Sequence, residues 1–491
     1  MRSTYFLGFF VVGAVAAMAT GCGDDDDTDG TGGSGGATTS TTTSTTTTTT
    51  APSDGDDTFE SAGEITIDGD AVEGELDPIE TDLDYYKFSG TAGQAIFIGT
   101  DAKPSSDEGD PTYPDLVITL YNAQKEQIAQ NDDPYPLPSS SNDSELYTIL
   151  PETGDFYLLV RECGVAFGEE SCAPSTDIVN LDYRLGMFTL DPEDDGVTSD
   201  TEPNDDPATN TLSPLEYVSN PSGGYYLTTV FGDFSATSDI DVYSFTVADS
   251  PSFDNQVVAN FFVPYVPGTD GGNGSTTQIG QVAIVDPDDL TKAVARIDPA
   301  TGGDIGAPIQ PDKEYYLFVK HPGATAGMHD FYFVNHVPTG SNPLEVLEVE
   351  NNLPATPSAL EPSANSAGGT SYFVDGVLPD GTTADEDYFA LPLPTGAGAT
   401  WKVSVSCGAQ RSGSGVRDFT FTVLNGDGSE LGATYTATET ATVDAKVLNQ
   451  AIPGDVAQGR LLLHISSGTA DPDVTSRFYR CGAHFLPPQQ Q

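Results

Sequence analysis

The chain has 491 residues, of which 37% are hydrophobic and 9% aromatic, so it is long enough and apolar enough for about three globular domains. It carries 17 basic against 75 acidic side chains, and this formal charge of −58 excludes nucleic acid as a partner because phosphates would be repelled. The acidic surplus would keep an extracellular protein soluble, and a chain that repels itself would also gain stability from divalent cations.

The N-terminus has the pattern of a secretory signal. Arg2 precedes the apolar run YFLGFFVVGAVAAMA, which is too short to span a bilayer, and the run is followed by TGC. Small residues directly before Cys22 resemble the lipobox of bacterial lipoproteins, in which this cysteine becomes the acylated first residue of the mature chain. The alternative is ordinary cleavage that leaves Cys22 as a spare thiol. We expect a lipoprotein signal peptide at 1–21 and a lipid anchor on Cys22 that holds the protein to the bacterial cell envelope, at the outer membrane or the cell surface.

The segment 22–56 that follows is rich in Asp, Gly and Thr and has almost no apolar residues. Such a sequence cannot offset the entropy lost on ordering. It is therefore expected to be a disordered tether that holds the rest of the chain away from a membrane surface.

Two motifs recur three times in the remainder of the chain. V-x-G-x-[LF] occurs as VEGEL, VFGDF and VDGVL, and about ten residues later each copy continues with DLDYYKF, DIDVYSF or DEDYFAL. Short apolar, β-branched and aromatic runs bounded by Gly, Pro, Asn and Asp follow, and the copies close with YRLGMFTL, DFYFVNHV and RFYRCGAHF. The pattern predicts an all-β chain of three tandem antiparallel β-sandwiches, at 57–192, 198–340 and 344–487.

The first copy resembles the bacterial pre-peptidase C-terminal domain along nearly its whole length. The resemblance is carried by DYYKF, GQAIFIGTDA, DLVITLYNAQKEQIAQNDD and SELYTILPETGDFYLLV, while the second and third copies share the skeleton. This family implies a jelly-roll-like β-sandwich, often appended to secreted peptidases and similar to the collagen-binding domains of clostridial collagenases. In some members a calcium ion is held where an acidic segment folds back against aspartates that lead into a later strand.

The aspartate motif poses a physical question. Strand alternation places Asp82 and Asp84 on the same side as Tyr86 and Phe88, so two carboxylates point toward the core, where unpaired carboxylates are not stable. The resemblance implies that calcium, which prefers oxygen ligands, satisfies them. The alternative is that they cap backbone N–H groups in Asx-turns. The candidate calcium ligands are Asp200, Glu202, Asn204, Asp205, Asp239 and Asp241 in the second copy, Glu348, Glu350, Asn352, Asp385 and Asp387 in the third, and Asp54, Asp56, Asp57, Asp82 and Asp84 in the first. A further acidic stretch, NGDGSE at 425–430, is expected to be a hairpin turn.

Four cysteines remain beyond Cys22. An even number in an exported chain predicts disulfides, and three pairings are formally possible. We predict Cys163–Cys172 and Cys407–Cys481, because each pair then lies within one repeat. Their spacing does not resemble a zinc site.

No convincing catalytic motif is present. The five histidines are scattered, paired carboxylates are uninformative in so acidic a chain, and Tyr315, Tyr316 and Trp401 are expected to pack in cores rather than to bind a ligand. We therefore expect a non-catalytic, lipid-anchored surface protein, monomeric, whose sandwiches bind an extracellular protein or polysaccharide or act as a calcium-stabilised spacer. The alternative is an accessory component of a secreted peptidase, or a hydrolase of unfamiliar type.

Overall fold

The computed structural model describes residues 55–102, 113–132, 142–167, 178, 180–193, 196–219, 226–249, 257–263, 274–277, 279–298, 303–323, 329–340, 344–345, 351–364, 369–378, 386–440, 444–466 and 469–488. The expected signal peptide, Cys22 and nearly all of the expected tether lie outside this part of the chain. None of the helices among the described residues has the length and apolar character needed to cross a membrane.

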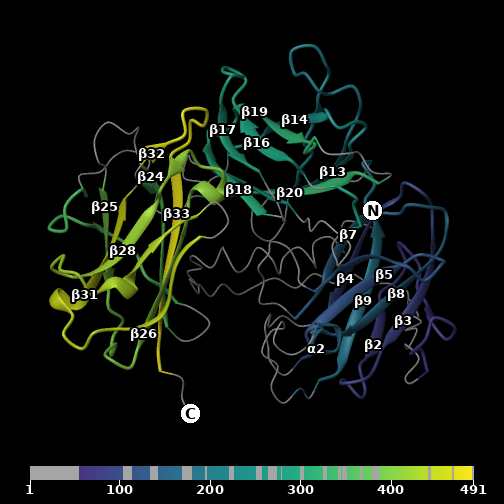
Figure 1. Ribbon diagram of the computed structural model, residues 1–491, viewed down its shortest axis with the longest axis horizontal. Coiled ribbons are helices and arrows are strands. Elements are labelled where there is room, and N and C mark those ends of the chain that lie inside the picture. The colour runs from purple at the N-terminus through teal and green to yellow at the C-terminus, as the bar shows by residue number, and fades with distance from the viewer. Residues whose placement is uncertain are drawn as a thin grey trace, which may run out of the picture.

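The described chain is built almost entirely of strands, and its larger sheets form three pairs with closely matching strand orders. We call these pairs sandwich 1 (β1–β9), sandwich 2 (β10–β20) and sandwich 3 (β21–β33). Figure 1 shows them in chain order, sandwich 1 in purple and blue, sandwich 2 in teal and sandwich 3 in green and yellow, with sandwich 2 between the other two. The prediction of an all-β fold made of sandwiches is confirmed.

Sandwich 1 has one sheet of order β1-β3-β8-β5-β6 and a second of order β2-β9-β4-β7. Its elements are β1 (Gly63–Glu64), β2 (Val72–Glu75), β3 (Asp84–Gly90), β4 (Ala95–Asp101), β5 (Leu116–Tyr121), β6 (Gln127–Asn131), β7 (Glu145–Ile149), β8 (Gly154–Glu162), α2 (Cys163–Phe167) and β9 (Asp182–Thr189).

Sandwich 2 repeats the arrangement with β11-β14-β19-β16-β17 and β10-β13-β20-β15-β18, and β12 pairs with β13. Its elements are β10 (Val197–Ser199), β11 (Ser213–Pro214), β12 (Val218–Ser219), β13 (Tyr226–Asp233), β14 (Ile240–Thr246), β15 (Val257–Val263), β16 (Gln281–Val285), β17 (Ala293–Ile297), β18 (Gly303–Ile309), β19 (Glu314–Lys320) and β20 (Phe331–Gly340).

Sandwich 3 has the sheets β22-β25-β31-β28-β29 and β21-β24-β33-β26-β30, with β23 beside β24 and a small β27-β32 pair. Its elements are β21 (Leu344–Glu345), β22 (Ser358–Ala359), β23 (Ser363–Ala364), β24 (Thr370–Val377), β25 (Glu386–Pro392), β26 (Lys402–Gly408), η2 (Gln410–Ser412), β27 (Val416–Arg417), β28 (Thr420–Asn425), η3 (Ala433–Tyr435), β29 (Thr436–Thr438), β30 (Ala445–Ala451), η4 (Ala457–Gly459), β31 (Arg460–Ser466), β32 (Thr469–Ala470) and β33 (Phe478–Leu486).

The strand pairs are antiparallel except at one edge of most sheets. There the short strands β1, β11 and β22 pair in parallel with β3, β14 and β25. Two further short strands, β10 and β21, pair in parallel with β13 and β24 in the second sheets. The sequence pattern predicted only antiparallel sheets, because a strand of two or three residues has no detectable period.

Each sandwich encloses its own apolar core between its two sheets. In sandwich 1 the predicted alternation holds, since Asp84, Tyr86 and Phe88 are all buried on β3. Trp401 is half-buried against the core of sandwich 3 and Tyr315 is buried in that of sandwich 2, as expected. Tyr316 instead packs on a small apolar cluster with Ala283, Val285 and Ala293, separate from that core.

The NGDGSE stretch forms the predicted turn. The N–H of Asn425 donates to the carbonyl of Ser429 at 2.8 Å, and the N–H of Gly428 donates to the carbonyl of Asn425 at 2.8 Å. The Asp427 carboxylate accepts the hydroxyl of Ser429 at 2.6 Å, and this bond is the main reason why the pKa of Asp427 is lowered.

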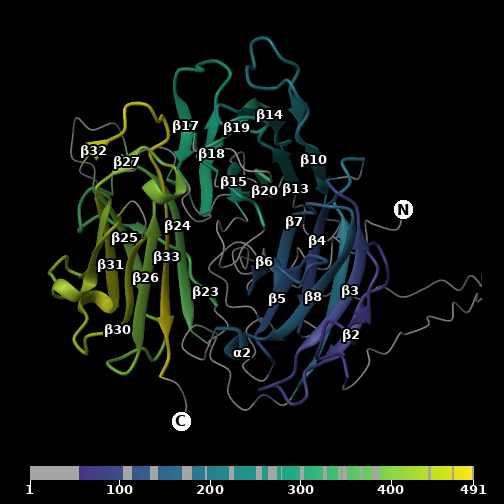
Figure 2. The same cartoon turned by 45° about the vertical axis from the view of Figure 1, so that its right-hand side comes forward.

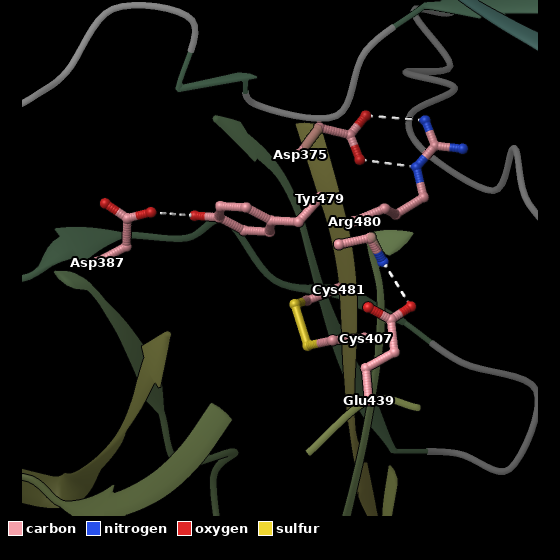
Figure 3. Close-up of a disulfide and its surroundings, with 8 residues drawn as sticks. Asp375, Asp387, Cys407, Glu439, Tyr479, Arg480 and Cys481 are labelled. Atoms are coloured by element: carbon pink, nitrogen blue, oxygen red, sulfur yellow. Dashed lines mark hydrogen bonds and ion pairs between the residues drawn. A yellow bond between two sulfur atoms is a disulfide. The ribbon is translucent and has the colours of Figure 1, made fainter. Parts of the chain in front are cut away.

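Sandwich 3 contains the predicted disulfide between Cys407 and Cys481. These residues are directly opposite each other on β26 and β33, with a Cα–Cα distance of 4.2 Å (Figure 3). Cys163 is also disulfide-bonded. Its predicted partner, Cys172, lies outside the described residues, so that pairing stays a prediction.

An aromatic cluster joins sandwich 1 to sandwich 2. Phe97, Tyr147 and Phe188 on the outer face of the β2-β9-β4-β7 sheet are buried together with Phe331 and Phe333 of β20. The rings of Tyr147 and Phe333 have their centroids 5.7 Å apart. In Figures 1 and 2, β4 and β7 accordingly lie beside β13 and β20. The contact buries large apolar side chains of both sandwiches, so the two are packed rather than merely linked.

Candidate metal centre

The two sequence motifs meet at one place in each sandwich. The glycine of V-x-G-x-[LF] lies directly opposite a tyrosine of the closing strand, and the tyrosine ring covers it. A Cβ added to Gly74 would lie 2.3 Å from Cζ of Tyr183, so only glycine fits beneath this ring. The three cross-strand pairs are Gly74 with Tyr183, Gly232 with Tyr332, and Gly376 with Tyr479.

In sandwiches 1 and 3 the tyrosine hydroxyl bonds to the second aspartate of the aspartate motif. Tyr183 donates to Oδ2 of Asp84 at 2.5 Å, and Tyr479 donates to Oδ2 of Asp387 at 2.6 Å (Figure 3). Burial raises the pKa of Asp84 to about 7, although the bond from Tyr183 opposes the shift. In these two sandwiches a protein hydroxyl therefore satisfies the buried carboxylate.

Sandwich 2 has the same pairing of tyrosine hydroxyls, Tyr332 with Tyr243 at 2.6 Å where sandwich 1 has Tyr183 with Tyr86 at 2.7 Å. It differs in that neither carboxylate oxygen of Asp241 has a partner in hydrogen-bond geometry among the described residues. Asp241 is nevertheless 0% exposed. A buried ionised carboxylate without partners is costly, so a proton or a positive charge would stabilise this position.

Two more carboxylates lie beside Asp241. Asp200 follows β10, Glu202 comes two residues later, and one oxygen from each of the three side chains lies within 4.8 Å of the others. In the described part of the chain this is the one group of three or more His, Cys, Asp or Glu side chains close enough to share a metal ion. The cluster thus brings two side chains of the segment that enters sandwich 2 next to Asp241 of β14.

Asn204 adds an amide to the cluster. Its Nδ2 donates to Oδ1 of Asp200, while its Oδ1 is buried and has no hydrogen-bond partner within the described residues. Its backbone N–H donates to Glu202 at 3.1 Å. The amide oxygen of Asn204 and the Asp241 oxygens are therefore buried acceptors that lack a donor among the described residues.

The electrostatics of the cluster favour a cation as well. Burial, followed by the charge of Asp200, raises the pKa of Asp241 to about 8, and the Tyr332 hydroxyl opposes this only in part. Burial and the charge of Glu202 raise the pKa of Asp200 to about 6. Burial also raises the pKa of Glu202. The ionised forms repel one another, so without a cation Asp241 is mostly protonated at pH 7, and a bound cation would favour its ionised form.

The first aspartate of the motif has another role in sandwiches 1 and 2. In sandwich 2 the Asp239 carboxylate accepts the backbone N–H groups of Ser235 and Ile240, the latter at 3.1 Å. In sandwich 1 Asp82 accepts those of Asp77 at 2.6 Å and Leu83 at 3.0 Å. This is the backbone-capping role that the sequence left open as the alternative to metal binding.

Asp205 also lies outside the three-carboxylate cluster. It is exposed, and its Oδ1 accepts the N–H of Ile240 at 3.3 Å. The six candidates of the second copy are therefore divided: Asp200, Glu202, Asn204 and Asp241 converge, whereas Asp205 and Asp239 bond to backbone at the entrance of β14.

In sandwich 1 the residue that corresponds to Asn204 is Asp56. It is buried, and its carbonyl accepts the N–H of Tyr85 at 3.2 Å, whereas the neighbouring Asp57 is exposed. Asp54 lies outside the described residues. Asp56, Asp82 and Asp84 are thus buried near one another, and the charges of Asp56 and Asp82 add to the raised pKa of Asp84.

In sandwich 3 the corresponding residue is Asn351, which sequence reasoning missed in favour of Asn352. The carbonyl of Asn351 accepts the N–H of Tyr388 at 3.2 Å, and neither polar atom of its side chain has a partner among the described residues. Asn352 is half-exposed. Matching VENN to TEPN residue by residue shifts the alignment by one position, whereas the Pro-Ala-Thr run shared by 207–209 and 354–356 places Asn351 opposite Asn204. Three other candidates, Glu348, Glu350 and Asp385, lie outside the described residues.

Comparisons with known proteins give no family assignment. No family model matches the sequence, and no curated protein matches it. Among solved structures, the pre-peptidase C-terminal domain of a Bacillus anthracis collagenase is 16% identical and covers 26% of this chain and 93% of its own, with a TM-score of 0.18. A secreted protein from Eubacterium rectale is 10% identical over 57% of this chain and 79% of its own, with a TM-score of 0.18. Tandem CBM51 modules of a Streptococcus pneumoniae family 98 glycoside hydrolase are 11% identical over 54% and 84%, with a TM-score of 0.15. With identities and TM-scores this low, we draw no function from these structures.

Proposed function

We propose that the chain is a non-catalytic array of pre-peptidase C-terminal-like β-sandwiches whose second sandwich is stabilised by Ca²⁺ bound through Asp200, Glu202, Asn204 and Asp241. The observation that carries this proposal is the fully buried Asp241, whose two oxygens have no hydrogen-bond partner within the described residues while two further carboxylates lie beside it. The other charged groups in the cluster are negative too, so its charge can be compensated only by bound protons or by a cation, and at high pH the cation is favoured.

The donor set favours calcium over other metals. Three carboxylates and one amide offer only oxygen, which hard cations prefer, and the cluster contains neither the nitrogen nor the sulfur typical of structural zinc sites. Magnesium binds fewer protein ligands and retains most of its water. A group of four side chains with oxygen donors, of which Asn204 and Asp241 are buried, is therefore better matched to calcium.

The role proposed for the ion is structural. Asp200, Glu202 and Asn204 belong to the segment that follows β10, and Asp241 belongs to β14 of the opposite sheet. An ion held by all four would tie this entering segment to both sheets of sandwich 2. Binding to the folded state alone raises stability by mass action, and a 100-fold excess over the dissociation constant adds about 2.7 kcal/mol.

The test is thermal unfolding of the full mature protein with millimolar CaCl2, compared with NaCl of equal ionic strength. Calcium should raise the Tm of the wild type, and Asp241→Asn should remove most of the gain while keeping the side-chain shape. The matched control is Asp298→Asn, an exposed aspartate of the same sandwich, which should respond to calcium like the wild type. A gain that is equal in the wild type and in Asp241→Asn would contradict the proposal.

The proposed location is the bacterial cell envelope, with the array anchored through lipid on Cys22. The support is the apolar run that ends in TGC before a polar segment. Mass spectrometry should find an acylated cysteine at the mature N-terminus, and Cys22→Ser should release the protein from membranes. Binding of an extracellular protein or polysaccharide stays a prediction, which an array of glycans and matrix proteins probed with the released Cys22→Ser protein would test.

A further inference from the structure

The free edge of one sheet in sandwich 2 is covered by sandwich 3. β17 is the last strand of the β11-β14-β19-β16-β17 sheet, and on its outer side Ala293 forms a parallel bridge with Val474. The N–H of Ala293 donates to the carbonyl of Asp473 at 3.0 Å, and the carbonyl of Ala293 accepts the N–H of Thr475 at 2.8 Å. A segment of sandwich 3 thus pairs with sandwich 2 as an additional strand would.

The pairing continues on both sides of this bridge. The N–H of Ser476 donates to the carbonyl of Val294 at 2.9 Å, and the N–H of Arg296 donates to the carbonyl of Gly413, directly after η2, at 2.8 Å. Gly413 has a φ of +87°, and a Cβ there would lie 2.9 Å from the amide nitrogen of Arg296. Glycine is therefore required at the point where the two backbones approach each other.

Side chains reinforce the same contact. The Asp471 carboxylate, which is mostly buried, accepts Nη2 of Arg417 from its own sandwich at 2.7 Å and Nη2 of Arg296 from sandwich 2 at 3.3 Å. The pKa of Asp471 is lowered in spite of partial burial, by the N–H of Asp473 and by the two arginines. One carboxylate therefore forms ion pairs with an arginine from each of the two sandwiches.

A second side-chain contact lies on the neighbouring face. Arg480 of β33 forms a two-pronged pair with Asp375 at 2.7 and 2.8 Å (Figure 3), and its Nη1 donates to Oδ1 of Asn260 on β15 at 3.4 Å. Nearby, Phe478 lies 3.9 Å from the position of a Cβ on Gly306 of β18. Both sheets of sandwich 2 therefore contribute to the contact with sandwich 3.

We infer that sandwiches 2 and 3 form one rigid body that unfolds cooperatively, in which residues 473–476 of sandwich 3 complete the edge of a sheet in sandwich 2. An open sheet edge presents unpaired N–H and carbonyl groups, and separation of the sandwiches would expose those of β17 together with the Asp471 and Arg480 contacts. Domains joined only by a linker share few contacts, so they move independently. Sandwiches 2 and 3 are instead joined by backbone and side-chain hydrogen bonds, so we expect them to move together. This inference does not depend on the proposed calcium site.

Hydrogen exchange on the full mature protein tests the inference without a mutation. The amides of Ala293, Arg296, Thr475 and Ser476 donate across the contact, so they should exchange at least about 100-fold more slowly than unstructured amides. Amides in the β14-β19 ladder, at the centre of the same sheet, provide the internal reference. Exchange of the four amides at unstructured rates while the β14-β19 ladder stays protected would overturn the inference.

A bulky substitution at the contact between sandwiches 2 and 3 provides a second, independent test. Gly306 lies in a strand without a positive φ, and a Cβ there would point toward Phe478 and lie 3.3 Å from Oδ1 of Asn260. Gly306→Trp should raise exchange at the four contact amides by about tenfold or more and split the calorimetric transition of the two sandwiches. The control is Gly154→Trp, a strand glycine with no atom within 4 Å of its added Cβ. A wedge that leaves both readouts unchanged would count against the inference, and if Gly306→Trp fails to fold, the exchange of the wild type decides.

Discussion

The hydroxyl of Tyr183 donates a 2.5 Å hydrogen bond to the buried carboxylate of Asp84. The tyrosine hydroxyl lies beside a second tyrosine hydroxyl in both sandwiches, Tyr183 beside Tyr86 and Tyr332 beside Tyr243, but in sandwich 2 no oxygen of Asp241 meets a donor in hydrogen-bond geometry within the described chain. The same arrangement of glycine, tyrosine and aspartate therefore gives the buried carboxylate a hydrogen-bond donor in sandwich 1 but not in sandwich 2. A hydroxyl serves in sandwich 1, and we propose that a cation serves in sandwich 2.

This difference predicts the effect of removing the hydroxyl. Tyr183→Phe should lower the free energy of unfolding by about 1–3 kcal/mol, because it leaves a buried carboxylate without its donor. The loss should be the same with and without calcium, measured by urea unfolding. Tyr157→Phe, at a half-exposed tyrosine of the same sandwich, is the control and should change little. Full recovery of Tyr183→Phe in calcium would show that Asp84 is also satisfied by a cation.

The raised pKa values predict how the calcium effect depends on pH. Asp241 and Asp200 have pKa values of about 8 and about 6 in the fold against an ordinary value of 3.8, so the folded state binds more protons than the unfolded one between these limits. Without calcium, stability should therefore be highest in acid and should fall as pH rises from about 4 to about 8, by up to about 1.4 kcal/mol per pH unit for each group. Bound calcium keeps both carboxylates ionised and removes this loss.

Calorimetry at pH 5, 6.5 and 8, with calcium or with EDTA, measures the dependence. The gain in Tm from calcium should be smallest at pH 5 and largest at pH 8. Asp84, whose pKa is about 7, adds its own pH dependence, but this part should cancel in the difference between calcium and EDTA. In Asp241→Asn the rise of the gain with pH should be largely lost. A gain that is constant or greatest in acid would contradict the proposed ligands.

The sequence was sufficient to predict the sandwiches and that Asp84 is buried, because both depend on local patterns. The period of two in DLDYYKF places Asp84 inside, and the repetition of the motif shows that the feature belongs to the architecture. The Cys407–Cys481 bond was also predictable, since both residues lie in one repeat. These inferences require only which residues share a face or a repeat.

Which aspartate lacks a hydrogen-bond donor could not be predicted in this way. Strand alternation places Asp82 and Asp84 on the same side. Asp82, however, lies before β3 and accepts the backbone N–H of Asp77. Asp84 instead accepts the hydroxyl of Tyr183, about a hundred residues away in the sequence. The tyrosine was visible in each closing run, and the glycine in each V-x-G-x-[LF] motif. Their relation became evident only once the register placed Gly74 opposite Tyr183.

The glycine beneath the tyrosine predicts a tight steric limit in sandwich 2. A Cβ on Gly232 would lie 2.5 Å from the hydroxyl oxygen of Tyr332 and 2.9 Å from Cβ of Asp200. Gly232→Ala should therefore lower stability by about 1–3 kcal/mol and, by displacing Asp200, reduce the rise in Tm produced by calcium. Gly154→Ala, in open space on β8, is the control and should be neutral. An unchanged calcium response in Gly232→Ala would separate the glycine from the metal centre.

The aromatic cluster between sandwiches 1 and 2 predicts a large cost for one truncation. Phe333 is completely buried and packs against Tyr147 of the other sandwich. Phe333→Ala should cost about 3–5 kcal/mol, since the cavity lies between two sheets that cannot easily collapse. Calorimetry should show sandwich 1 melting separately from the rest. Phe167→Ala, at a side chain that is 42% exposed, should be nearly silent, and an equal effect of both changes would mean that the cluster does not couple the sandwiches.

The Cys407–Cys481 bond predicts a link between covalent structure and the contact of sandwiches 2 and 3. It closes a loop with a sequence separation of 74 and should contribute about 4 kcal/mol on the chain-entropy model. Its loss should also loosen β33, where the next residue before Cys481 is Arg480, the partner of Asn260 in sandwich 2.

The double change Cys407→Ala and Cys481→Ala should therefore lower the Tm of sandwich 3 and speed exchange at the contact amides of Ala293 and Thr475. Reduction of the wild type should reproduce this effect. Any further fall in Tm when the double variant itself is reduced would then report the bond made by Cys163 in sandwich 1. If the double variant loses stability while exchange at Ala293 stays as slow as in the wild type, the disulfide stabilises sandwich 3 alone and the contact is held by its own hydrogen bonds.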